Sequence, residues 1–128
     1  MKKTVKILIS IIVVIVIIIG GGMFYLMHGM KAVADEKING VELTNISDGL
    51  YTGKYESGRF SNEIAVVVKD KKIVGIKIIK DVTFAKPEVS NALFAQVIIN
   101  QKTAVDTITG ATVTSKAYLK AIENALSK

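Results

Sequence analysis

Residues 63–80, EIAVVVKDKKIVGIKIIK, predict a β-hairpin, and this hairpin decides the fold class of the chain. Apolar residues alternate with other residues over 63–69 and again over 72–80, which is the pattern of two half-buried strands. Only an aspartate and a lysine separate the strands, so we expect an antiparallel pair, although the usual turn glycine is missing. Ile73 and Ile79 lie opposite the main apolar row, so part of that face must also be covered. The side chains expected on the main apolar face are Ile64, Val66, Val68, Val74, Ile76 and Ile78.

Four further segments complete the expected domain. Residues 50–56 predict a first strand, and residues 103–105 predict a short additional one. A helix is expected over 87–100, because a proline and a glutamate suit its first turn and apolar residues recur at spacings of four. A second amphipathic helix is expected over 116–126. The sequence therefore predicts an α+β domain, in which a small antiparallel sheet (a meander) packs with two helices. In the last helix we expect Tyr118, Ala121, Ile122 and Ala125 to be buried, and Lys116, Lys120, Glu123 and Lys128 to face water.

A long apolar block precedes this domain. Residues 7–27 carry no formal charge, and as a helix they would span roughly 30 Å, about the hydrocarbon core of a bilayer. The lysines in residues 1–6 predict a cytoplasmic basic flank, with the C-terminal part outside the cytoplasm. A signal peptide cleaved after Ala34 is the alternative, but the block exceeds the ~7–15 apolar residues of a signal core. We therefore expect a single-pass anchor, a juxtamembrane stalk over 28–47 and an outer domain over 48–128.

The composition excludes several classes of protein. With no cysteine, the chain has no disulfide, iron–sulfur cluster or c-type haem attachment. With His28 as its single histidine, it has no histidine-based metal site and no Ser-His-Asp triad. The net charge is +6, but much of it comes from the N-terminal lysines, and no basic stripe interleaves with aromatic residues. Nucleic acid is therefore not an expected partner.

Residues 106–115, DTITGATVTS, form a hydroxyl-rich run directly before the last helix. One interpretation is structural: Thr114 or Ser115 would be the N-cap of that helix, and Gly110 would supply a tight turn. The other is functional, because free N–H groups and the helix dipole favour a phosphate at a helix start. Gly110 and Ala111 would let that phosphate approach the main chain, where a threonine hydroxyl can bond to it or be esterified by it. The lysine and spacing of a nucleotide-binding P-loop are missing. The residues alone leave both interpretations open.

The hydroxyl-rich run resembles the flavinylation motif of FMN-binding-domain proteins. This family includes the C subunit of the sodium-pumping NADH:quinone oxidoreductase and the G subunit of the Rnf complex. Residues 48–53, DGLYTG, are similar to the family's opening strand, and the hairpin and the following helix occupy the expected places. The loop at residues 57–62 departs from the family pattern, because it has a single glycine where relatives are often glycine-rich. The resemblance covers residues 48–126, almost the whole predicted outer domain.

The resemblance implies that FMN is joined through its phosphate to a threonine, by a separate flavin transferase that uses FAD as donor. Thr112 matches the modified threonine of the family, and Thr114 is the second choice. The other residues that the resemblance places at the cofactor are Asp106, Thr109, Gly110, Ala111 and Ser115. A covalent link suits a protein outside the cytoplasm, because a tether keeps the cofactor at high effective concentration regardless of binding strength.

We therefore expect a membrane-anchored flavoprotein that relays electrons between a membrane donor complex and an outside acceptor. It is expected to be an electron carrier, not a stand-alone enzyme. The alternative is a non-redox binding module in which the hydroxyl-rich run is only a helix cap. Arg59 is a candidate for a flavin oxygen or a partner's acid, or it is solvated, and Lys116 either steadies the phosphate or faces water. Aromatic side chains that would stack on the flavin, or simply pack, are Tyr51, Tyr55, Phe60 and Phe84.

Overall fold

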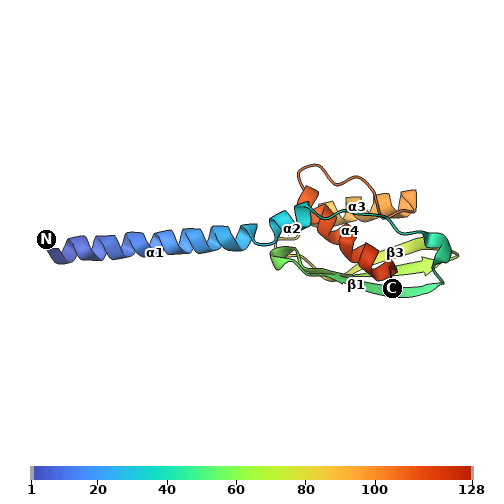
Figure 1. Ribbon diagram of the computed structural model, residues 1–128, viewed down its shortest axis with the longest axis horizontal. Helices are drawn as coiled ribbons and strands as arrows, with labels where there is room; N and C mark the ends of the chain where they lie inside the picture. The colour runs from blue at the N-terminus through green and yellow to red at the C-terminus, as the bar shows by residue number, and fades with distance from the viewer. Residues whose placement is uncertain (1, 128) are drawn as a thin grey trace.

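The computed structural model describes residues 2–127, which form a long N-terminal helix followed by a sheet with two helices on one side (Figure 1). The expected α+β class, the three-stranded antiparallel meander and the two packed helices are confirmed. The elements in chain order are α1 (Lys2–Met27), α2 (Met30–Ala34), η1 (Leu43–Asn45), β1 (Gly49–Tyr55), η2 (Gly58–Phe60), β2 (Asn62–Lys69), β3 (Lys72–Lys80), α3 (Pro87–Asn100) and α4 (Thr112–Leu126).

The β2–β3 hairpin forms as predicted, without a glycine in its turn. Asp70 and Lys71 both adopt the left-handed conformation, with φ of 52° and 61°, as a two-residue hairpin turn of this hand requires. Two bonds to the preceding segment hold this conformation. The Asp48 carboxylate accepts the Asp70 N–H at 2.8 Å, and the Lys71 ammonium donates to the Thr44 carbonyl at 2.6 Å. These tertiary contacts take the place of the missing glycine.

Two irregularities in β3 change which side chains face the core. The pairing with β2 skips Val74 and skips Ile79, so β3 carries one extra residue at each of these two places. Ile73 is consequently only 1% exposed, whereas Val74 and Ile79 are each 54% exposed. The predicted inward position of Val74 and outward position of Ile73 are therefore wrong. Strict alternation assumes an unbroken ladder, and a bulge inverts it locally.

The helices cover one face of the sheet. Helix α4 lies across β1 and β2, and α3 lies against β3. The contact between α4 and β1 is close because Gly53 has no side chain; a Cβ there would lie 2.8 Å from the Ala125 Cα and would overlap the Ala121 carbonyl oxygen. The apolar faces predicted for both helices are confirmed as buried. Large, fully buried side chains of the core are Tyr118, Phe60, Ile64, Ile73, Leu93, Leu119 and Ile122.

The segment predicted as a stalk, residues 28–47, packs on the domain. Val33, Leu43 and Ile46 belong to the hydrophobic core. The Lys116 ammonium also donates to the Ala34 carbonyl at 2.7 Å, which fastens α4 to the end of α2. No hydrophobic periodicity marks this segment, so its docking is not visible in the sequence. The result is that the start of α4 lies beside the end of the N-terminal helix pair (Figure 1).

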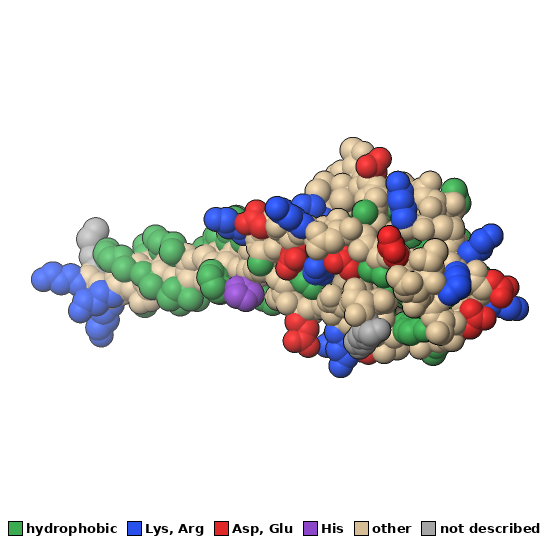
Figure 2. Space-filling model, turned by 45° about the vertical axis from the view of Figure 1, so that its right-hand side comes forward, with side chains coloured by type: hydrophobic (Ala, Val, Ile, Leu, Met, Phe, Trp, Pro, Cys, Tyr) green, Lys and Arg blue, Asp and Glu red, His purple; other side chains and the backbone are tan. Residues whose placement is uncertain are grey.

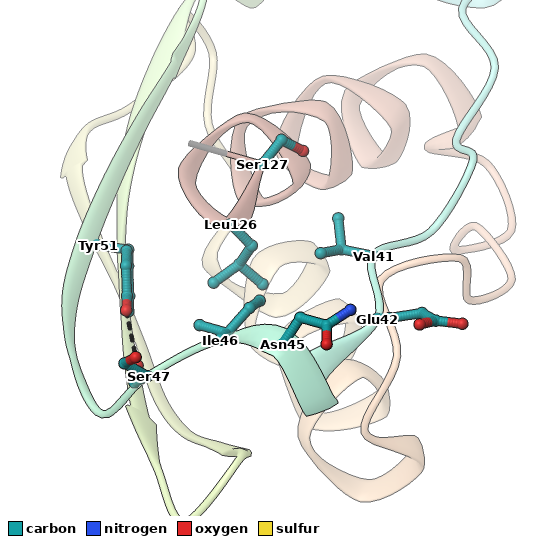
Figure 3. Close-up of a pocket in the computed structure, with 8 residues that line it drawn as sticks. All are labelled: Val41, Glu42, Asn45, Ile46, Ser47, Tyr51, Leu126 and Ser127. Carbon is teal, nitrogen blue, oxygen red and sulfur yellow. Dashed lines mark hydrogen bonds between the residues drawn. The ribbon is translucent and has the colours of Figure 1, made fainter.

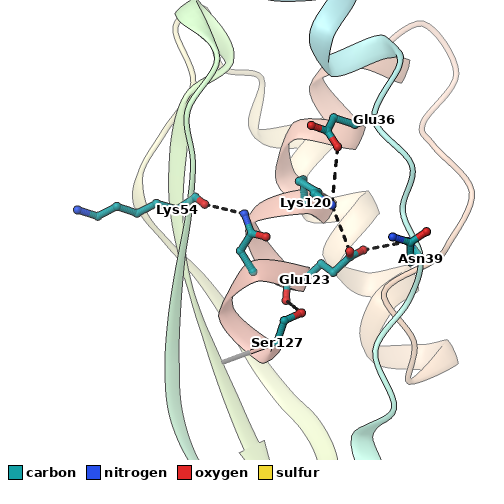
Figure 4. Close-up of polar contacts among 7 residues, drawn as sticks. Glu36, Asn39, Lys54, Lys120, Glu123 and Ser127 are labelled. Atoms are coloured by element: carbon teal, nitrogen blue, oxygen red, sulfur yellow. Dashed lines mark hydrogen bonds and ion pairs between the residues drawn. The ribbon is translucent and has the colours of Figure 1, made fainter.

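Glu123 is 7% exposed, so its predicted position facing water is wrong. Its carboxylate accepts the backbone N–H of Asn39 at 3.1 Å and the Lys120 ammonium at 3.3 Å, and Glu36 lies 3.7 Å from the same ammonium (Figure 4). A buried carboxylate is tolerated because it has hydrogen-bonding partners on both oxygens. Lys120 is half-buried, and Lys128, also predicted to face water, lies outside the described residues.

Residues 103–105, predicted as a short strand, form no strand. The Val105 N–H donates to the Thr103 carbonyl at 3.0 Å, two residues back, which is the bond of a tight turn. This turn begins the loop that leads to α4. The chain thus reaches the hydroxyl-rich run without adding to the sheet.

Helix α1 is long and apolar enough to cross a membrane, by length and composition. It contains the span predicted over 7–27, and its side chains are exposed along its whole described length. Figure 2 shows hydrophobic side chains along this helix and basic side chains gathered at its free end.

Candidate functional site

The hydroxyl-rich run forms a tight turn and the first turn of α4. The Ile108 carbonyl accepts the Ala111 N–H at 2.9 Å, and Gly110 has φ of +80°, so the tight turn predicted at Gly110 is confirmed. Ser115 is fully buried, and its Oγ accepts the Ile108 N–H at 3.1 Å. Both backbone groups of Ile108 are therefore engaged, and the turn is fastened directly to the helix that follows it.

Helix α4 begins earlier than predicted, at Thr112, with Ala111 as its N-cap. The predicted caps, Thr114 and Ser115, are wrong because both lie inside the helix, where Ser115 bonds to the turn. No side chain caps this helix. Within residues 2–127, the backbone N–H groups of Thr112, Val113 and Thr114 have no acceptor. These three donors and the positive end of the helix dipole would suit an anion.

The motif residues differ in how accessible they are. Thr109, Gly110 and Thr112 are exposed, whereas Thr114 is half-buried. A Cβ at Gly110 would meet no atom within 4 Å, so the space beside the turn is open. Asp106 is exposed at the start of the loop, and its carboxylate has no hydrogen-bond or ion-pair partner among the described residues. The hydroxyl that is both exposed and placed on the helix start is that of Thr112.

A small cavity of about 210 Å³ lies beside this helix start. We call it the Phe84 cleft. Its lining residues belong to η2, to the start of α3 and the loop before it, and to the turn before α4 and the first turn of that helix. Its contributors outside the motif come from two distant places in the chain, residue 59 and residues 84–89, so no sequence pattern marks the cleft. Lys86 and Val89 were not predicted as site residues. The residues that line it are Arg59, Phe84, Lys86, Val89, Gly110, Ala111 and Thr114.

Residues 21–127 match the sequence model of the FMN-binding domain. The chain belongs to the FMN-binding domain family. FMN is accordingly its cofactor, and the resemblance seen in the hydroxyl-rich run is confirmed at the level of the family. The matched region begins inside α1 and includes residues 28–47, which pack on the domain. No curated protein is significantly similar to the chain.

The helix start fits the phosphate of FMN. Three backbone N–H groups have no acceptor within the described part of the chain, and Gly110 leaves room beside them. Arg59 and Lys86 add positive charge at the neighbouring cleft. The phosphate of FMN is an anion with several acceptor oxygens, so free donors, a helix dipole and nearby cations suit it.

Arg59 joins the FMN-binding domain to the end of α1. Its Nε donates to the Leu26 carbonyl at 2.8 Å, and its guanidinium carbon lies 4.1 Å from the centre of the Phe60 ring. It is half-buried, so its side chain is solvated only in part. Lys116 likewise bonds to α2 and does not simply face water. Both side chains hold the N-terminal helices against the domain.

The four aromatic candidates have different positions. Tyr55 and Phe60 are buried in the core, and burial, followed by the nearby Glu36 carboxylate, raises the pKa of the Tyr55 phenol. Tyr51 packs against the core and donates to the Ser47 carbonyl. Phe84 is 67% exposed and lines the cleft beside the motif. Of these four, it is therefore the one placed to meet a flavin attached at the helix start.

A larger cavity of about 580 Å³ lies at the opposite end of α4 (Figure 3). Its lining includes Glu42 and the last residues of α4, where the helix dipole is negative. The helix is 15 residues long, which places this cavity roughly 20 Å from Thr112. It contains no residue of the motif, and its charge disfavours a phosphate. We therefore take the other end of the helix as the candidate FMN site.

Proposed function

We propose that the protein carries FMN covalently, as a phosphoester on Thr112, and relays electrons between a membrane donor and an acceptor outside the cytoplasm. The observation that carries the proposal is the exposed Thr112 hydroxyl on the first residue of α4, beside three N–H groups without an acceptor in the described residues. Family membership supplies the ligand, and this geometry supplies the place for its phosphate.

Attachment requires a flavin transferase with FAD as donor. The Thr112 Oγ attacks the phosphorus on the FMN side of the FAD pyrophosphate, the phosphorus–oxygen bond to the AMP phosphate breaks, and AMP leaves while the hydroxyl proton is lost. The role of the chain is to present the hydroxyl and to stabilise the negative phosphate. Exposure of Thr112 serves the first need, and the helix start serves the second.

The same geometry weighs against the non-redox alternative. In that alternative the threonines serve to cap α4, yet no threonine or serine side chain caps it. Apart from Ser115, whose Oγ accepts the Ile108 N–H, the hydroxyls of the run therefore lack the structural role that this alternative gives them. Bound flavin supplies the redox chemistry, and the chain binds, orients and shields it.

The membrane side of the proposal rests on α1 and on Arg59. Helix α1 suits a membrane span, and the lysines at its start favour a cytoplasmic N-terminus. The Arg59–Leu26 bond places the Phe84 cleft next to the end of this helix. A cofactor in this position would be close to the bilayer surface, which suits exchange with a membrane-bound donor complex.

Flavin attachment is tested by coexpressing the full chain with a flavin transferase and examining denatured protein. Wild type and Thr112→Ser are expected to fluoresce on a denaturing gel and to gain the mass of FMN less one water, whereas Thr112→Ala is expected to gain neither. Trypsin should release residues 103–116 as one peptide, which locates the ester. Flavin retained by Thr112→Ala and mapped to Thr114 would contradict the assignment. A colourless wild type would favour the binding-module alternative.

Orientation is tested with single cysteines, since the chain has none of its own. Asn91→Cys is exposed on α3, and Thr4→Cys is exposed near the start of α1. In intact cells a membrane-impermeant maleimide should label Asn91→Cys, and should label Thr4→Cys only after permeabilisation. The reverse pattern would place the domain in the cytoplasm.

A further inference from the structure

Phe84 combines two properties that a phenylalanine rarely has together. It lies 67% exposed on the loop before α3, and its backbone is in the left-handed region at φ of 62°. A bulky residue in that region is an outlier, and burial, the usual reason for keeping a phenyl ring, does not explain this one. The ring instead forms part of a cleft that the flavin attachment motif also lines.

We propose that the Phe84 cleft holds the isoalloxazine ring of the FMN, with the Phe84 ring against one face of it and Val89 beneath. This inference rests on the proposed attachment at Thr112. Ala111 precedes Thr112 in the chain and lines the cleft, so phosphate and ring would occupy adjacent places. Aromatic rings at such contacts favour offset stacking, which adds attraction beyond the area that they bury.

The size of the cleft agrees with binding of the isoalloxazine ring of a covalently attached cofactor. Its volume of about 210 Å³ is below the ~300–1,000 Å³ of a typical small-molecule pocket, so it would not enclose a whole free nucleotide. A covalently held ring does not need such a pocket, because the tether keeps its local concentration high. A small cleft with one aromatic wall is then sufficient.

The charge of the cleft also has a consequence for the flavin. Arg59 and Lys86 line it, and a reduced flavin can carry a negative charge, which nearby cations stabilise. The two cations therefore favour the reduced form and make the midpoint potential less negative. Lys86 is exposed, so screening by salt limits its share of this effect.

The position of the ring is tested by placing an indole at Phe84, which is possible because the chain contains no tryptophan. An indole quenches flavin fluorescence only at close contact, by giving an electron to the excited ring. In the flavinylated full chain, Phe84→Trp is expected to reduce native flavin fluorescence several-fold, with recovery on denaturation. The matched control is Ile99→Trp, since Ile99 is 79% exposed on α3, roughly 15 Å along the helix from Val89.

Equal native fluorescence of Phe84→Trp and Ile99→Trp, each with one covalent flavin by mass, would contradict the proposed position of the isoalloxazine ring. A wild-type chain without covalent flavin would overturn the proposed function itself, so the two failures are distinguishable. Two further readouts should agree with the indole result. Phe84→Ala should make native flavin fluorescence more sensitive to iodide, and Lys86→Gln should give a more negative midpoint potential than Lys77→Gln, which removes an exposed lysine on β3.

Discussion

Gly53 on β1 lies directly against the backbone of Ala121 on α4, with no side chain between strand and helix. This contact sets how closely α4 approaches the sheet. Thr112 is the first residue of that helix, so Gly53 also affects where the proposed attachment residue lies relative to the sheet. The glycine of the opening strand thus has a structural reason in this chain.

Gly53→Ala should destabilise the domain by ~4 kcal/mol or more, because the new methyl group would meet helix backbone, which cannot move aside. Gly75→Ala is the matched control, since its Cβ would lie 3.8 Å from Val67, an ordinary contact, and should change stability by less than ~0.5 kcal/mol. Thermal unfolding of the full chain in detergent, followed by circular dichroism, measures both. Similar melting temperatures for the two variants would contradict the close β1–α4 contact.

Ser115→Ala should cost about 1–2 kcal/mol and slow flavin loading, because the Ile108 N–H loses its buried acceptor and the turn before α4 loosens. Ser90→Ala is the control, because Ser90 is also buried but donates locally to the Pro87 carbonyl. Stability is measured by thermal unfolding, and loading by in-gel flavin fluorescence against time. If both variants load as fast as wild type, the Ser115 bond does not shape the attachment site.

Stability should fall as the pH rises above about 10, the ordinary tyrosine value. Burial, with a hydrogen bond to Asp81 as the second cause, raises the pKa of the Tyr118 phenol. Above pH 10 the unfolded chain loses this proton while the folded chain keeps it, so ionisation favours unfolding. The raised pKa of Tyr55 acts in the same direction.

Tyr118→Phe tests whether Tyr118 causes this loss of stability at high pH. It should lower stability by about 1–2 kcal/mol at pH 8, because the Asp81 carboxylate loses a charge-assisted bond, and it should flatten the decline above pH 10. Melting temperatures from pH 8 to 11 compare the variant with wild type. If the melting temperature of the variant falls with pH as steeply as that of wild type, Tyr118 is not the cause of the decline.

Glu123→Ala should loosen residues 36–42, because the Asn39 N–H loses its acceptor and Lys120 loses a buried partner. The expected cost is about 1–3 kcal/mol, and trypsin should cut faster after the exposed Lys37. Glu123→Gln keeps an acceptor oxygen and should show a smaller effect. Glu88→Ala, at an exposed position in the first turn of α3, should leave the cleavage rate unchanged.

Local periodicity predicted much of the fold because β2 and α3 each bury one regular face. It did not predict the exposure of Val74, since a bulge depends on pairing with the neighbouring strand. Burial of Glu123 was also missed, because its partner Asn39 lies in a segment without periodicity. The motif marked the region of the helix start, but the helix begins at Thr112, earlier than the predicted start at residue 116. The Phe84 cleft was invisible because the fold, not the sequence order, brings its walls together.

The bond from Arg59 to the Leu26 carbonyl has a consequence for the search for redox partners. A carrier on a long, loose linker would swing through a wide volume. Here a hydrogen bond joins the domain to the end of α1. In a bilayer the proposed flavin would therefore keep a nearly constant height above the lipid. Partners anchored in the same membrane would then meet it by lateral diffusion, whereas a soluble acceptor would have to descend to the lipid surface.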